Sequence, residues 1–273
     1  MKRILFYSSV NSLELFKTQK FYQIDISILK DLGYDVLLSN RIFDSLLFWK
    51  YDILFSYFYR YSFFAALLAK CFGKKTYFTG GIDSLDSDYA SAFNYKIQAL
   101  FFKLCYWVAD SCIIVSQSDL KNIFKVSSLK KKLSYSEHVI NTKLFIADVP
   151  KEKIFTSIVW MGDEGNVVRK GVDKALQIFA ELKKIPEFVD YRFVIIGRKG
   201  EGEVLVRSII DKYNLKGSVE LKGEVSEEDK INLLKQSKYY FQLSLYEGFG
   251  LAALEALCAN NIIIHSGKGG LAN

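Results

Sequence analysis

A glycine-rich loop near the C-terminal end, set between an apolar run and a helix, constrains the fold of this chain most. The aromatic and apolar residues 239–245 predict a buried strand, and residues 251–259 have the composition of a helix. A further apolar run follows at 262–265. This order of strand, tight loop, helix and strand is typical of a parallel α/β sheet, which binds ligands where its strands end. Glycines let backbone N–H groups approach a ligand, and a helix start attracts phosphate or sugar oxygens.

Two glutamates frame this loop. Glu247 lies at its entrance, and Glu255 lies in the following helix, where side chains lean back toward the N-terminus. We therefore expect both carboxylates to face the same site. Because a carboxylate only accepts hydrogen bonds, the pair suits a polyhydroxylated ligand better than an anion. The alternative is a helix that carries two solvated glutamates.

The positive charge is concentrated in the first half of the chain. Residues 1–147 hold 19 lysines and arginines against 12 aspartates and glutamates, which accounts for the whole net charge of +7. A basic half favours an anionic partner such as a membrane surface, a lipid phosphate or nucleic acid. Since no nucleic-acid motif is present, we favour an anionic membrane, with simple solubility as the alternative.

The cysteines and the N-terminus indicate a reducing, cytoplasmic location. Cys71, Cys105, Cys112 and Cys258 form no C-x-x-C pair and have apolar neighbours, which predicts buried free thiols rather than disulfides or a zinc site. The N-terminus leads directly into an apolar strand, without the pattern of a secretory signal.

Residues 42–72 are rich in aromatic side chains. Charged residues such as Asp44, Lys50 and Asp52 interrupt them, so they contain no span of about 20 apolar residues that crosses a bilayer. Most of these rings are expected in the core. A patch that lies in a membrane interface is the alternative, and the basic run at 130–132 is either a solvated face or a contact with anionic lipid.

The second half contains cations close to predicted strand ends. Arg169 and Lys170 follow a polar loop predicted at 162–168 and precede a helix predicted at 174–183. Cations are unfavourable at a helix start unless an anion is bound, so this position favours a phosphate site. Gly197 ends the strand predicted at 191–196, and Gly223 follows the strand predicted at 218–221. The five strands of this half predict one parallel sheet.

These motifs together resemble a known enzyme family. Glu-x7-Glu around Gly-Phe-Gly resembles the signature of the retaining glycosyltransferases of family 4, and residues 109–116, 139–145 and 267–271 resemble further landmarks in the same order. The resemblance is strong from about residue 154 onward and loose before it. Asp163 stands where the family has an arginine, which leaves Arg169 as the candidate substitute, and His138 and Ile140 depart from the linker pattern; His138 is interpreted as structural. The tail that relatives carry after the last motif is missing, which predicts a C-terminally truncated member.

The resemblance implies an α/β fold of the GT-B type, in which two Rossmann-like domains with parallel sheets face a cleft. Residues 1–150 would form the acceptor-side domain and residues 151–273 the nucleotide-sugar domain, incomplete at its end. The boundary is expected near residues 146–152, in a short polar stretch that contains Pro150.

The resemblance also assigns roles to residues. Glu247 would bind the transferring sugar and steady positive charge at its reacting carbon, while Lys170 would neutralise the departing diphosphate. The other expected donor contacts are Arg169, Gly248, Phe249, Gly250, Leu251, Glu255, Gly197 and Gly223, with Glu255 holding the ribose hydroxyls. No metal and no cofactor beyond the donor are expected.

The implied reaction moves a sugar from a nucleotide diphosphate sugar to a saccharide or polyprenyl-linked acceptor with retention. It would serve cell-surface polysaccharide or glycolipid synthesis at the inner face of the cell membrane. Two alternatives stay open: a catalytically inactive module that binds a nucleotide sugar or a glycan, suggested by the missing tail and Asp163, and an inverting transferase.

Overall fold

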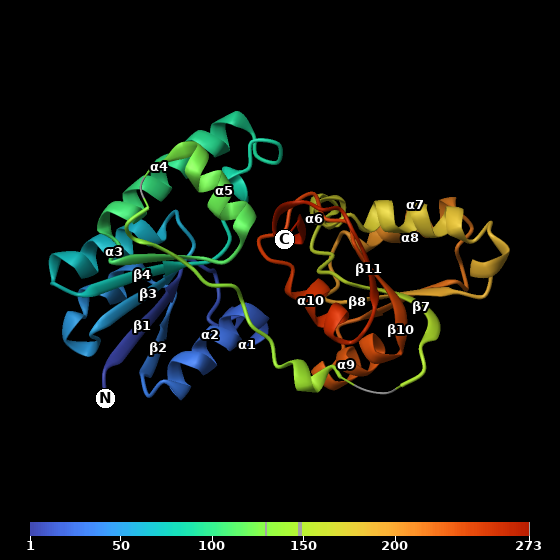
Figure 1. Ribbon diagram of the computed structural model, residues 1–273, viewed down its shortest axis with the longest axis horizontal. Coiled ribbons are helices and arrows are strands. Elements are labelled where there is room, and N and C mark those ends of the chain that lie inside the picture. The colour runs from blue at the N-terminus through green and yellow to red at the C-terminus, as the bar shows by residue number, and fades with distance from the viewer. Residues whose placement is uncertain (129, 147–148, 273) are drawn as a thin grey trace. The chain divides into compact units, whose positions relative to one another are not determined.

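The computed structural model describes residues 1–128, 130–146 and 149–272. The chain divides into two compact units, with Met1–Val139 and Ala272 in the first and Ile140–Leu271 in the second. Each unit is built around its own parallel sheet with helices on both faces (Figure 1). This confirms the predicted α/β class with two Rossmann-like parallel sheets.

The first unit holds a six-stranded sheet in the order β2-β1-β3-β4-β5-β6. Its strands are β1 (Arg3–Ser8), β2 (Asp35–Ser39), β3 (Ile53–Tyr57), β4 (Lys75–Thr79), β5 (Ser111–Ile114) and β6 (Leu133–Tyr135). Its helices are α1 (Leu15–Thr18), α2 (Lys20–Asp31), α3 (Ser62–Cys71), α4 (Ala92–Val108) and α5 (Gln117–Val126).

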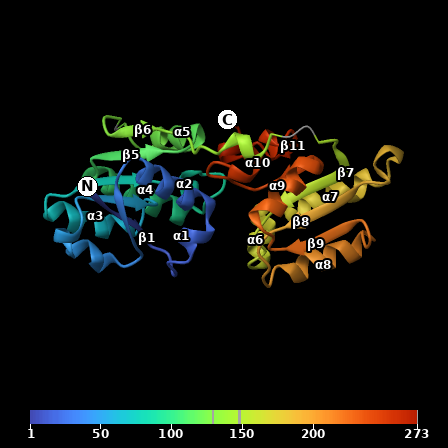
Figure 2. The same ribbon diagram turned by 90° about the horizontal axis from the view of Figure 1, so that it is seen from below.

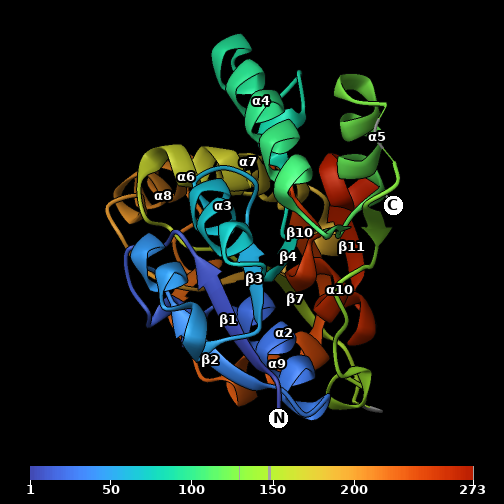
Figure 3. The same ribbon diagram turned by 90° about the vertical axis from the view of Figure 1, so that its left-hand side faces the viewer.

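Alternating side chains of the central strand β1 build the two layers of this unit. Ile4 and Phe6 pack with aromatic residues of α1 and α2, whereas Leu5 and Tyr7 belong to the cluster that α3, α4 and α5 complete. Because successive strand residues point to opposite faces, one apolar run serves both layers. Figure 3 shows α4 as the longest helix of this unit, running next to α3.

The second unit holds a five-stranded sheet in the order β11-β10-β7-β8-β9. Its strands are β7 (Glu152–Ile158), β8 (Arg192–Ile196), β9 (Val219–Gly223), β10 (Ser237–Gln242) and β11 (Ile262–His265). Its helices are α6 (Glu164–Lys170), α7 (Val172–Leu182), α8 (Glu203–Lys212), α9 (Glu227–Gln236) and α10 (Leu251–Cys258). Figure 2 shows β7, β8 and β9 as neighbouring strands.

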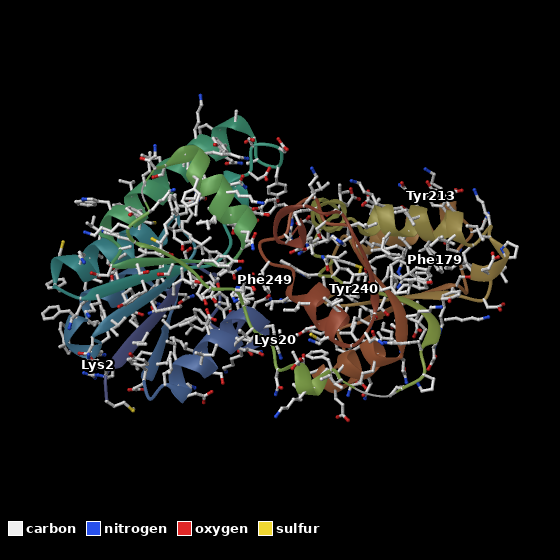
Figure 4. All side chains as sticks on the ribbon, in the orientation of Figure 1. Lys2, Lys20, Phe179, Tyr213, Tyr240 and Phe249 are labelled. Atoms are coloured by element: carbon white, nitrogen blue, oxygen red, sulfur yellow. The ribbon has the colours of Figure 1, made fainter. Side chains whose placement is uncertain are left out.

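The second sheet is also covered on both faces. Phe155 packs with Phe179 of α7 in the cluster that includes α8, while Tyr240 packs with α9 and α10 on the other face. Phe179 and Tyr240, one from each layer, are labelled in Figure 4. The loops that follow the five strands therefore all leave the same edge of a rigid sheet.

The unit boundary lies earlier than the sequence predicted. The expected boundary near 146–152 includes residues 147 and 148, which lie outside the described residues. Ile140 and Phe145 pack with Leu234 and Tyr240, so the segment after Val139 belongs to the core of the second unit. The apolar contacts of Phe145, which is 2% exposed, explain this shift.

The prediction of a polar loop at 162–168 was wrong, because residues 164–170 form helix α6. The Asp163 side chain caps this helix by accepting a hydrogen bond from the Asn166 backbone N–H at 2.6 Å. Arg169 and Lys170 therefore occupy the last turn of a helix rather than the first. Since cations are favourable at a helix C-terminus, the argument that their position requires an anion does not hold.

The other local predictions were met in part. Cys105 and Cys112 are buried free thiols, and burial raises the pKa of Cys112 to about 12, but Cys71 is exposed and Cys258 only half-buried. The His138 ring lies against the Phe21 ring. Burial lowers the pKa of His138, and the negative charge of Asp25 opposes this shift in part.

The aromatic stretch 42–72 divides between core and surface. Tyr51, Tyr57 and Tyr59 are buried, whereas Phe43 and Trp49 are exposed. Within the described residues, no helix combines the length and apolar character needed to span a bilayer.

Candidate active site

Two of the predicted residues, Lys170 and Glu247, meet where the order in which the chain adds strands to the second sheet reverses. The chain proceeds outward from β7 through β8 to β9 and then returns to place β10 on the other side of β7. The loops after β7 and β10 start side by side, and the connections that follow them lead to opposite ends of the sheet. This is a topological switch point, where open α/β sheets bind ligands. The loop after β7 leads into α6 and Lys170, and the loop after β10 carries Glu247.

Lys170 and Glu247 form a half-buried ion pair at this point. Lys170 Nζ donates to Glu247 Oε1 at 2.5 Å, and their side chains are 22% and 13% exposed. The same oxygen accepts hydrogen bonds from Gln242 Nε2 at 2.9 Å and Ser244 Oγ at 2.7 Å. Among the described residues, none donates a hydrogen bond to the other carboxylate oxygen, Oε2. One oxygen is therefore fixed by the protein, and the other is left as an acceptor for a ligand hydroxyl.

A buried tyrosine extends this network beneath the loop. The Tyr240 hydroxyl donates to Gln242 Oε1 at 3.0 Å and accepts from the Ile158 backbone N–H at 3.3 Å. Burial raises the Tyr240 pKa, and the negative charges of Glu247 and Glu255 raise it further. The phenol stays protonated and supports the orientation of Gln242, which in turn holds Glu247.

Glu255 makes a separate ion pair. Its Oε2 accepts from Lys230 Nζ of α9 at 2.8 Å, and the two side chains are only 4% and 13% exposed. Its Oε1 is buried and has no hydrogen-bond partner among the described residues. Buried polar atoms in proteins nearly always have partners, so this oxygen marks Glu255 as a residue that the packing of the unit alone does not explain.

Glycines allow the backbones around the Lys170–Glu247 pair to pack closely. Gly171 has a φ of +69°, and a Cβ at this residue would lie 2.0 Å from the Leu243 carbonyl oxygen. A Cβ at Gly269 would lie 2.1 Å from the Glu247 carbonyl oxygen, and that oxygen accepts from the Gly270 N–H at 2.6 Å. The α6–α7 corner and the segment 267–270 thus fix the loop from two directions.

The remaining candidates are placed around this edge of the sheet. Gly250 caps α10 with a φ of +92°, so Gly248, Phe249 and Leu251 lie at the start of this helix. Gly197 and Gly223 meet each other where β8 and β9 end, through a backbone hydrogen bond of 2.8 Å. The Arg169 guanidinium is bound to Asn166 Oδ1 at 2.7 Å, next to the cap of α6.

Three side chains that hold the glutamates were not predicted from the sequence: Gln242, Ser244 and Lys230. Gln242 and Ser244 are polar residues two apart at the end of an apolar run, which places them on one side of an extended segment and was a usable signal. Lys230 had no such signal, because it lies in an acidic first turn that predicts an ordinary solvated helix start. Within the described residues, no group of three or more histidine, cysteine, aspartate or glutamate side chains is arranged to hold a metal ion.

Comparison of the whole chain with solved structures identifies the fold class. The structure of HepE from Anabaena in complex with UDP and glucose superimposes with a TM-score of 0.73 at 14% identity, covering 100% of this chain and 82% of that one. Sucrose-phosphate synthase from Thermosynechococcus elongatus gives a TM-score of 0.72 at 16% identity, covering 99% and 82%. The fold is that of the GT-B glycosyltransferases.

Sequence comparison then identifies the family of the second unit. Residues 165–273 match the family model described as glycosyl transferases group 1. The second unit therefore carries a group 1 glycosyltransferase domain, and this confirms the family resemblance at that level.

Curated relatives match over a similar number of residues. The chain is 36% identical over 101 residues to the GDP-mannose:cellobiosyl-diphosphopolyprenol alpha-mannosyltransferase of Xanthomonas oryzae pv. oryzae, which is 36% of this chain and 26% of that protein. It is 30% identical over 105 residues to one of the subunits of human phosphatidylinositol N-acetylglucosaminyltransferase, covering 38% and 21%. The match thus spans about a quarter of the length of these relatives.

Proposed function

We propose that this chain is a retaining, metal-independent glycosyltransferase of family 4. It would transfer a hexose-type sugar from a nucleotide diphosphate donor to a saccharide or lipid-linked acceptor, in the synthesis of a surface polysaccharide or glycolipid. The observation that carries the proposal is the Lys170–Glu247 pair at the switch point of the second sheet. Relatives named for mannosyl and N-acetylglucosaminyl transfer to lipid-linked acceptors support it.

Lys170 and Glu247 each suit one of the two charges that develop during sugar transfer, one negative and one positive. As the bond between the anomeric carbon and the diphosphate oxygen breaks, the electron pair goes to the phosphate and positive charge develops on the sugar. Lys170 would stabilise the departing diphosphate, and the Glu247 carboxylate would bind the sugar and face the positive charge. The acceptor oxygen forms the new bond on the same face, and its proton leaves with the diphosphate.

The surrounding groups would bind the rest of the donor. The unpartnered Oε1 of Glu255 suits a ribose hydroxyl. Backbone N–H groups of Phe249, Gly250 and Leu251 would contact sugar or phosphate, because a helix N-terminus favours negative charge. We assign Arg169 to the diphosphate, and the backbone around Gly197 and Gly223 to the nucleotide.

A pocket of the first unit would bind the acceptor. It has a volume of about 590 Å³ and lies where β1 and β2 end. Its walls include Arg41 together with Tyr7, Phe43 and Tyr61, and also the polar residues Ser9 and Asp44. An arginine among aromatic rings suits a saccharide that carries phosphate, since the rings pack against sugar faces and the guanidinium binds phosphate oxygens. With such an acceptor the protein would act in the cytoplasm, peripheral to the inner face of the membrane.

The proposal is tested in two stages with purified protein. GDP-mannose, UDP-glucose and UDP-N-acetylglucosamine are first screened by thermal shift, since a bound donor raises the melting temperature by mass action. The stabilising donor is then incubated with diphosphopolyprenol-linked cellobiose or phosphatidylinositol, and the product is analysed by mass spectrometry. We expect turnover in the presence of EDTA, an unchanged anomeric configuration by NMR, and loss of turnover in Glu247→Gln with nucleotide binding retained.

Each other outcome selects a specific alternative. Nucleotide binding without turnover on any acceptor favours the inactive binding module, for which Asp163 in place of the family's arginine is the supporting observation. An inverted product favours the inverting transferase. Absence of any nucleotide binding contradicts the proposal as a whole.

A further inference from the structure

Helix α4 of the first unit exposes large apolar side chains in one line. Its inner face is buried through Gln98, Phe102 and Cys105. On its outer face Phe93, Leu100 and Trp107 are 72%, 56% and 68% exposed. These residues are seven positions apart, so they lie on the same side of the helix with a drift of only about 20° per step. Single exposed apolar residues are ordinary, but three large ones along one helix face form a patch.

Lysines alternate with these apolar residues along the same face. Lys96 and Lys103 are exposed and each lies three residues after an apolar member, which places it on the same side of the helix. Helix α4 contains neither aspartate nor glutamate. At its C-terminal end, Lys132 Nζ donates to the carbonyl oxygens of Tyr106 and Trp107 at 3.2 and 3.0 Å, which adds a third cation beside Trp107.

The apolar surface continues onto the neighbouring helix α3. The partly buried ring of Phe101 lies 6.4 Å from the Tyr61 ring and 6.3 Å from the Phe64 ring, both of which are exposed. The patch therefore extends from α4 across Phe101 to the start of α3.

We propose that the outer face of α4 docks on an anionic lipid bilayer. A helix of 17 residues is about 25 Å long and can lie flat in the interface, with its apolar side chains among the acyl chains and its lysines at the lipid phosphates. Tryptophan and phenylalanine suit this layer, and lysine stems extend to keep their charge in the headgroups. The net charge of +7 in the first half complements the negative lipid surface. A bilayer fits this pattern better than a protein partner, because lysines, and neither aspartate nor glutamate, accompany the apolar residues along the whole length of α4.

The test measures flotation of the full chain with vesicles and needs neither donor nor acceptor, so its result is independent of the proposed reaction. Vesicles contain phosphatidylcholine alone or phosphatidylcholine with an equal part of phosphatidylglycerol. We expect binding to the anionic vesicles that weakens with salt, because exposed charges are screened. Each lysine near an anionic surface strengthens binding about fivefold, so Lys96→Glu/Lys103→Glu lowers the affinity by at least about tenfold.

A second variant and matched controls test whether vesicle binding depends on the outer face of α4 or on the general surface of the protein. Phe93→Ser/Leu100→Ser/Trp107→Ser likewise loses at least about tenfold in vesicle affinity, since each apolar group that leaves the lipid weakens partition. Val189→Ser/Val204→Ser and Lys174→Glu/Lys212→Glu change exposed residues of the second unit and leave flotation unchanged. Circular dichroism and the melting temperature verify that each variant is folded.

A direct measurement covers the case in which the triple variant does not fold. With Trp49→Phe/Trp160→Phe, Trp107 is the remaining tryptophan, and its fluorescence is quenched by bromine-labelled acyl chains if α4 enters the bilayer. The proposal is overturned if the wild type does not float, if the α4 variants float as well as the wild type, or if Trp107 is not quenched. It is also overturned if sedimentation velocity shows that this face joins two copies of the chain, with the dimer abolished by the triple substitution.

Discussion

At the scale of single residues, the two candidate glutamates of the second unit are held in ion pairs with different surroundings. Lys170 and Glu247 retain some exposure, and one oxygen of Glu247 is not used by the described residues. Lys230 and Glu255 are nearly buried, and one oxygen of Glu255 has no partner among them. The first pair is therefore accessible to a ligand, whereas the second is enclosed and holds Glu255, the proposed ribose contact.

Replacement of Lys170 by alanine tests the first pair. A charge-assisted hydrogen bond contributes about 1.5–3 kcal/mol, so Lys170→Ala lowers kcat/KM by roughly ten- to a hundredfold. Lys174→Ala, an exposed lysine of α7, is the matched control and leaves kcat/KM unchanged. Steady-state kinetics with the identified donor give both values, and a loss of less than twofold in Lys170→Ala would remove this residue from the site.

Replacement of Lys230 by methionine tests the second pair through stability. Glu255 then remains buried without its cation, which costs about 3–5 kcal/mol of the free energy of unfolding. Lys230→Met/Glu255→Leu recovers most of this loss, because no buried unpaired charge remains; the other partner of Lys230, Glu227, has a side chain that is 49% exposed. Chemical denaturation measures both variants, with Lys212→Met of the exposed face of α8 as control. If the double variant is no more stable than the single one, the interaction of Lys230 with Glu255 is not what stabilises this part of the unit.

At the scale of elements, the α6–α7 corner determines where Lys170 lies. Gly171 separates the two helices in a left-handed conformation and approaches Leu243, immediately after β10. The Leu245 N–H also donates to the Arg169 carbonyl oxygen at 2.8 Å. These contacts join the corner to the segment that leads to Glu247, so Lys170 reaches Glu247 from a fixed backbone.

Gly171 and Gly217 have similar backbone angles, so alanine substitutions at the two residues separate the cost of a left-handed conformation from the cost of a steric clash. Gly217 has a φ of +82° and open space around its Cβ position, so Gly217→Ala costs only the left-handed conformation, about 1 to 2 kcal/mol. Gly171→Ala adds a clash with the Leu243 backbone and costs about 4 kcal/mol or more. Equilibrium unfolding compares the two variants; equal losses would show that the corner yields freely and does not position Lys170.

The elements also show what the sequence could predict. Long apolar strands and amphipathic helices such as α7 were predictable, because their periodicity reflects burial on both faces of a sheet. Helix α6 was not, since seven residues with a single buried side chain, Val167, show no clear period. The pairing of Lys170 with Glu247, 77 residues apart, follows from strand order, which depends on how the chain returns from β9 to β10.

At the scale of the whole molecule, the buried clusters of the described residues each draw their members from one unit. Each unit has a core large enough to unfold cooperatively by itself. We therefore expect two calorimetric transitions on heating. A nucleotide that binds to the second unit raises one transition and leaves the other in place.

The Gly171→Ala variant assigns these transitions. It lowers the transition of the second unit alone, while the other keeps the wild-type temperature. A single transition that shifts as a whole with nucleotide or with Gly171→Ala would contradict the independence of the two cores.

The division of the buried residues into separate clusters also matters for evolution. Mutations that repack one half do not require compensating changes in the other half, so the two halves can diverge at different rates. A recombination point near codon 140 would leave each of these buried clusters intact.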